Sequence, residues 1–134
     1  MMTRMMVPTE NRVRHAAEIF GRYFSYPVEP TIYTVADRLS ADYGGGYWAF
    51  WALDNQGFYM APDTEETFSV ICENGFEGSL SADAFGITCC LYTYSNLSFQ
   101  KDPGLACRCA EQYHRLRMYV YDHPEAEDIL RATD

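Results

Sequence analysis

The sequence predicts an α+β fold, a single compact domain in which a small antiparallel β-meander of three to four strands packs with about four to five helices. Three observations support this. The chain has 134 residues, 48% of them hydrophobic, which suffices for one core without disulfide bonds. Apolar residues recur with helical spacing before residue 40 and after residue 81, and with strand-like alternation between them. The loops between the expected strands are too short for parallel crossovers.

Two helices are expected before residue 40. The first begins near Thr9, just after Pro8, and ends before Gly21. Its expected inner face consists of Val13, Ala16, Ala17 and Phe20. The second begins at Pro30 and Thr31, and its apolar residues fall at i, i+3, i+4 and i+7: Ile32, Val35, Ala36 and Leu39.

The central part of the chain predicts strands over 47–53, 58–61, 68–72 and 76–80. The segment Asp54-Asn55-Gln56-Gly57 is a turn signal between the first two. Alternation places large rings on both faces of the first strand, with Tyr47 and Trp51 opposite to Trp48 and Phe50. We expect these rings to pack in the core, with helices covering both faces or a partner covering one.

The C-terminal part predicts three helices. Ser81, followed by Asp83 in the first turn, is a helix N-terminus, and this helix runs to about Asn96. A second helix spans roughly 105–121 and is broken by His123-Pro124. The last covers 125–132.

Charge and composition exclude several classes of function. The net charge is −9, with +1 over residues 1–40 and −10 over residues 41–134, and no Lys or Arg occurs from residue 42 to 100. Nucleic-acid binding relies on cations facing phosphates, so we expect no direct nucleic-acid binding. Five cysteines at irregular spacing suit a reducing compartment. Without a secretory signal or a long apolar run, we expect a cytoplasmic protein that does not contact the membrane, and a monomer.

Local motifs do not indicate an enzyme or a cofactor. The three glycines at 44–46 follow a helix and precede a strand, the reverse of the order in phosphate-binding loops. Cys107 and Cys109 have CxC spacing, which on a helix points the thiols apart and suits buried thiols better than zinc. A Cys–His nucleophilic pair stays an alternative, although no motif singles out a cysteine. We therefore expect no catalytic residue, metal or cofactor.

The excess of acidic residues over 41–134 raises the question of whether the protein mimics DNA. A domain of this size has a diameter of about 36 Å, a length that in duplex DNA carries roughly 21 phosphates. A net charge of −9 is well short of that number. A complete mimic is not expected, but an acidic face remains an alternative at 63–66 or at 122–128.

Three segments together resemble the ArdB/KlcA antirestriction family. They are YGGGYWAFWALDNQGFYMAP, ENGFEGSLSADAFGIT and YHRLRMYVYDHPEAEDILRATD, and the resemblance covers about residues 29–134. Residues 1–28 depart most from the family pattern. The resemblance implies one antirestriction domain over 1–134, a fold of the family's own, and a non-enzymatic protein of plasmids or other mobile elements. It implies protection of incoming DNA from host type I restriction-modification machinery, reached directly or through an intermediary.

Two exposed loop ends are candidate partner contacts, because polar groups at loop ends suit recognition. The first is the glycine loop, with Asp42, Gly44 and Gly45. The second is the C-terminal corner, with Asp122, His123, Glu125 and Asp128. Both segments also serve as helix stop signals, which is the competing interpretation.

Overall fold

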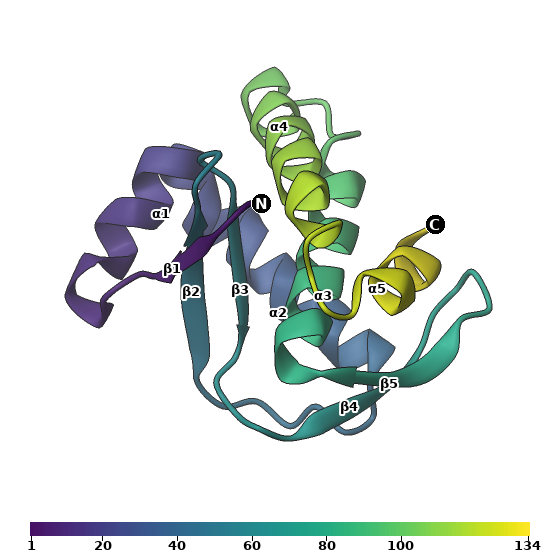
Figure 1. Ribbon diagram of the computed structural model, residues 1–134. Helices are drawn as coiled ribbons and strands as arrows, with labels where there is room; N and C mark the ends of the chain where they lie inside the picture. The colour runs from purple at the N-terminus through teal and green to yellow at the C-terminus, as the bar shows by residue number, and fades with distance from the viewer.

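The computed structural model describes all residues 1–134 and confirms the α+β class. Its five α-helices are α1 (Arg12–Phe20), α2 (Glu29–Leu39), α3 (Ala82–Leu97), α4 (Pro103–Val120) and α5 (Ala126–Thr133). Its strands are β1 (Arg4–Met6), β2 (Trp48–Leu53), β3 (Phe58–Pro62), β4 (Thr67–Ile71) and β5 (Glu77–Ser81). Figure 1 shows α3 in the middle of the molecule, between the sheet that contains β2 and β3 and the C-terminal α5.

The strands form two antiparallel sheets instead of the one expected meander. The first has the order β1-β2-β3, and the second is the hairpin β4-β5. Pro62, which has no N–H to extend the ladder, is the last residue of β3. Strand β1 is a finding that the sequence did not predict, because it is only three residues long and all three are exposed.

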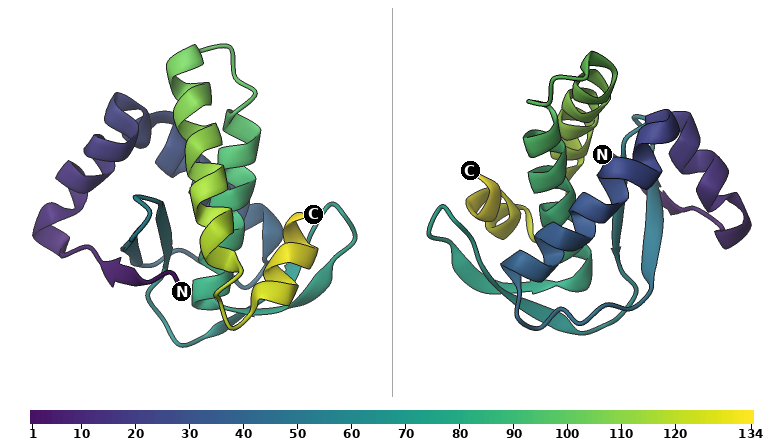
Figure 2. Two further views of the ribbon diagram at one scale, coloured as in Figure 1. Left: turned by 45° about the horizontal axis from the view of Figure 1, so that its top comes forward. Right: turned by 180° about the vertical axis from the view of Figure 1, so that it is seen from behind.

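Helix α3 is the centre of the core and contacts α4, α2 and β3. Twelve of its sixteen residues are buried, and Ser81 caps its N-terminus by accepting a hydrogen bond from the N–H of Ala84 at 3.1 Å. A Cβ at Gly86 would collide with the backbone of Ala61, so glycine is required where α3 lies against β3. Helix α2 lies on the side of the molecule opposite to α4 (Figure 2). None of the helices is both long and apolar enough to cross a membrane.

The aromatic hairpin β2–β3 is packed against helices on both faces, which is the first of the two arrangements that the sequence predicts. On one face Trp48 contacts Tyr33 of α2, with ring centroids 5.4 Å apart. On the other face Trp51 pairs with Tyr59 across the ladder, and Tyr59 stacks on Tyr119 of α4 at 5.9 Å. Trp48, Phe50, Phe58 and Tyr59 are therefore part of the core and Trp51 is half-buried, but Tyr47 is 54% exposed, so the expectation that every ring of this segment packs in the core is wrong for Tyr47.

The expected inner face of α1 is wrong for two of its four residues. Ala16 and Phe20 are buried, but Ala17 is exposed and Val13 is 86% exposed. Helix α1 lies at the edge of the molecule (Figure 1), so only a narrow i, i+4 stripe faces the core. By contrast, all four expected inner residues of α2 are buried.

Candidate functional site

The glycine loop is an open surface at the end of α2. The carboxylate of Asp42 accepts a hydrogen bond from the N–H of Ser69 at 2.9 Å, which ties the loop to β4. Gly44 and Gly45 are exposed, and an added Cβ would meet no atom within 4 Å at either. Gly45 has φ 98°, a left-handed conformation that favours glycine. The loop borders a hollow of about 370 Å³ that Asp63 and Glu66 also line.

The C-terminal corner is exposed only in part. Asp122 is exposed and accepts a hydrogen bond from the N–H of Met2 at 2.8 Å. Asp128 is half-buried and lies 3.9 Å from Arg131. The expectation that the whole corner is exposed is wrong for His123, which is only 8% exposed. Its ring is directed inward because both of its nitrogens have partners inside the protein.

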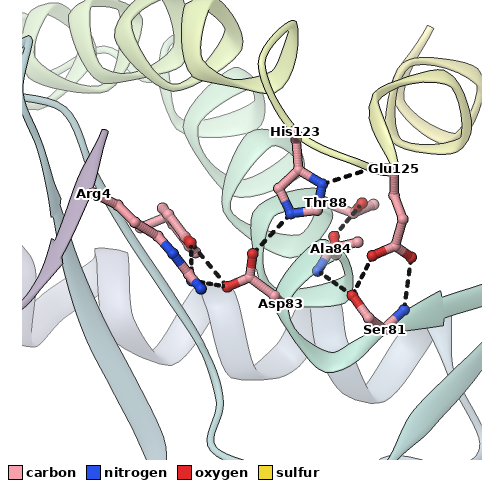
Figure 3. A network of polar contacts seen from close by, with 8 residues as sticks. Arg4, Ser81, Asp83, Ala84, Thr88, His123 and Glu125 are labelled. Atoms are coloured by element: carbon pink, nitrogen blue, oxygen red, sulfur yellow. Dashed lines mark hydrogen bonds and ion pairs between the residues drawn. The ribbon is translucent and has the colours of Figure 1, made fainter. Parts of the chain in front are cut away.

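One of those partners is the carboxylate of Asp83, the centre of a group that we call the Asp83 cluster: Arg4, Tyr59, Asp83 and His123. Figure 3 shows Arg4 and His123 on either side of Asp83. Asp83 Oδ1 accepts from Arg4 Nη1 at 2.5 Å and from the Tyr59 hydroxyl at 2.8 Å. Asp83 Oδ2 lies 2.8 Å from His123 Nε2. His123 Nδ1 accepts from the N–H of Glu125 at 3.0 Å, so the ring proton lies on Nε2, which donates to Asp83.

The cluster shifts the pKa values of its own members. Burial alone would raise the pKa of Asp83, but the hydrogen bond from His123 and the charge of Arg4 outweigh it and hold that pKa below its usual value. Burial also raises the pKa of Tyr59, and the charge of Asp83 raises it further. Asp83 is therefore a carboxylate and Tyr59 a neutral hydroxyl at neutral pH.

Glu125 completes the N-terminus of α3. In a capping box the third helical residue accepts from the N–H of the capping residue, but that position in α3 is Ala84. Glu125 takes this role from a distant part of the chain, since its carboxylate accepts from the N–H of Ser81 at 3.0 Å and from the Ser81 hydroxyl at 2.5 Å. The C-terminal corner thus holds α3 in place.

The Asp83 cluster joins β1, β3, α3 and the C-terminal corner, and each of its carboxylate oxygens has a donor. This arrangement suits stabilisation of the fold rather than acid–base chemistry on a bound substrate. Of the two CxC cysteines, Cys109 is buried as expected, but Cys107 is exposed, so the expectation of buried thiols is wrong for Cys107. No group of three or more His, Cys, Asp or Glu side chains is placed to hold a metal ion.

Comparison with known proteins places the chain in a family. The family model described as "Antirestriction protein" matches residues 41–134. The chain belongs to the antirestriction protein family. The antirestriction protein KlcA of Escherichia coli is 35% identical over 99% of this chain and 95% of its own length. YafX of Escherichia coli K12, a protein without assigned function, is 37% identical over 99% of this chain and 88% of its own length.

Members of the antirestriction family also share the fold. A solved structure from work on the KlcA and ArdB proteins matches this one with a TM-score of 0.91 and 36% identity. The match covers 99% of this chain and 95% of that chain. The KlcA and ArdB proteins are described there as having a novel fold and antirestriction activity against type I DNA restriction systems in vivo but not in vitro.

The structure does not join the two candidate surfaces that the sequence predicted. No hydrogen bond or ion pair connects the glycine loop with the C-terminal corner. The sequence also missed Arg4 and Tyr59 as partners of Asp83. The only signal for this contact was the position of Asp83 in the first turn of a helix, which has an explanation of its own in the helix dipole.

Proposed function

We propose that this protein protects incoming mobile-element or phage DNA from host type I restriction-modification systems. One observation carries the proposal, the likeness of the whole chain to KlcA in sequence and to the KlcA and ArdB fold. The likeness includes the N-terminal strand and helix, which lie outside the segment that the family model matches. The activity is exerted in the cytoplasm, where incoming DNA meets the restriction enzyme.

The inhibition works through protein contacts and needs no catalytic step or complete imitation of DNA. Seven of the nineteen carboxylates have an arginine within 4.0 Å, so cations interrupt the acidic surface. Duplex DNA presents an unbroken series of phosphates, which such a surface cannot reproduce. The protein acts as a monomer on the restriction machinery, directly or through an intermediary.

An intermediary explains how an antirestriction protein can act in the cell and yet fail to inhibit the restriction enzyme in vitro. The KlcA and ArdB proteins show this difference. A factor supplied by the host, or a step of restriction that occurs only in the cell, would account for it. We propose that this protein likewise depends on such a host factor or on such a step of restriction.

Plating of unmodified phage on a type I restricting host tests the function. Expression of the protein should raise the plating efficiency toward that on a non-restricting host. Modified phage, which the enzyme does not cut, is the control for effects on growth. Equal restriction with and without soluble protein would reject the proposal. A cell extract that restores inhibition of the purified enzyme, when the protein alone does not inhibit, would support the intermediary.

A further inference from the structure

A polar groove lies between α1, the β2–β3 turn and α4, and shares no lining residue with the glycine loop or the C-terminal corner. It has a volume of about 470 Å³. The polar side chains that line it are His15, Glu18, Gln56, Glu111, Gln112 and Arg115. We call it the α1–α4 groove.

The groove contains hydrogen-bonding atoms without protein partners. Gln112 is 3% exposed and lies on the face of α4 that borders the groove, yet its Oε1 is buried and has no hydrogen-bond partner. Nε2 of His15, which lines the same groove from α1, is buried and unpartnered as well. Buried polar atoms in proteins are rarely left unpaired, and each needs an explanation.

The local structure fixes the unpaired oxygen of Gln112 in place. Nε2 of Gln112 donates to the carbonyl of Gln56 at 3.2 Å, so flipping the amide would set two oxygens against each other. That carbonyl also accepts from Arg115 Nη1 at 3.4 Å. Nδ2 of Asn55 donates in turn to the carbonyl of Arg115 at 3.0 Å, which holds the turn against α4.

The charges around the groove favour a cation that donates hydrogen bonds. Glu18 and Glu111 bring two carboxylates to its rim. Arg115 is engaged with Glu111 at 3.1 Å and with the carbonyl of Gln56. Glu18 is 67% exposed, and its nearest cation, Arg14, is 4.0 Å away. The groups left free include two acceptors, the Gln112 oxygen and the Glu18 carboxylate, beside His15 Nε2, which donates or accepts according to its tautomer.

We propose that the α1–α4 groove binds an arginine side chain presented by a protein partner. A guanidinium has five N–H donors and no acceptor, and its planar fork matches a carboxylate. It would pair with Glu18 and donate to Gln112 Oε1, an atom that is buried in the free protein, so binding requires a side chain of the groove to move. This inference rests on the proposed function, because it names the surface through which the antirestriction partner is held.

Binding is tested with N-acetyl-arginine methylamide as the probe and ¹⁵N-labelled protein observed by NMR. The probe should shift the side-chain amide signals of Gln112. The citrulline analogue, which has the same shape without the charge, should bind about tenfold more weakly or worse. No shift with the arginine probe, or equal shifts with both probes, would overturn the inference.

Two variants locate the binding energy in the groove. Gln112→Met removes the acceptor while keeping the length of the side chain, and Glu18→Gln with Glu111→Gln removes both rim charges. Each should weaken binding of the probe about tenfold. The matched control is Glu10→Gln with Glu77→Gln, which removes the same charge at exposed positions elsewhere. An equal loss in the control would show that only the overall charge matters.

The same variants in the plating assay separate the two proposals. If the wild-type protein protects phage and the groove variants do not, although they fold and the control protects, both proposals stand. If the groove variants protect as well as the wild type, the groove is not the partner surface and the inference fails. If the wild type itself does not protect, the proposed function fails, and binding of the probe alone decides whether the groove recognises arginine.

Discussion

Two polar clusters contact the β2–β3 hairpin, and they differ in how completely their hydrogen bonds are satisfied. In the Asp83 cluster, both carboxylate oxygens and both ring nitrogens of His123 have partners. In the α1–α4 groove, Gln112 Oε1 and His15 Nε2 have none. A satisfied buried network stabilises a fold, whereas an unsatisfied one costs free energy that a ligand can recover. This difference indicates that the Asp83 cluster stabilises the fold and that the α1–α4 groove binds a partner.

The largest expected effect is the loss of Asp83. Asp83→Ala leaves Arg4, Tyr59 and His123 without their common acceptor, so we expect a loss of about 2–4 kcal/mol in the free energy of unfolding. Urea denaturation followed by circular dichroism measures it. Asp128→Ala is the control, because its ion pair with Arg131 is half exposed and weak, and it should cost no more than about 0.5 kcal/mol. Equal losses in the two variants would show that Asp83 contributes no more to the free energy of unfolding than a carboxylate at the surface.

A smaller effect follows from the lowered pKa of Asp83. A carboxyl whose folded pKa lies below its unfolded value, about 3.9, contributes stability above that pH and loses it as the pH falls through the folded value. The wild type should therefore exceed Asp83→Asn in stability at pH 7, and the difference should shrink below about pH 4. Urea unfolding of both proteins across this range measures it. A difference that stays constant with pH would contradict the assigned role.

The sequence predicts the elements of this fold better than the contacts between them. Periodicity found the buried stripe of α2 and the strands of the hairpin, because each depends on spacing within one element. The Asp83 cluster joins Arg4 to residues 55, 79 and 119 positions away in the chain, and no local pattern records such contacts. The same holds for Gln112, whose environment depends on where the β2–β3 turn lies on α4. The sequence predicts an exposed His123 because polar groups at loop ends suit recognition, but both ring nitrogens of His123 have partners inside the protein.

For the groove we expect little effect on stability when the unpaired group is removed. Gln112→Met loses the hydrogen bond to the Gln56 carbonyl but also removes the buried oxygen that has no partner. The two contributions oppose each other, so the free energy of unfolding should change by less than about 1 kcal/mol. Urea denaturation at neutral pH measures it. A loss above about 2 kcal/mol would show that Gln112 belongs to a satisfied network like the Asp83 cluster.

The last expected effect concerns the backbone of the turn that carries the groove. Gln56 has φ 68°, a left-handed conformation that favours glycine, and the contacts to α4 use its carbonyl. Gln56→Gly should therefore raise the free energy of unfolding by about 0.5 kcal/mol, because relief of strain outweighs the added entropy of the unfolded chain. Gln56→Val, with a branched Cβ in the same conformation, should lower it by about 1–2 kcal/mol. Thermal unfolding of both variants measures the contrast. A loss of stability in the glycine variant would show that the Gln56 side chain, and not its carbonyl, holds the turn to α4.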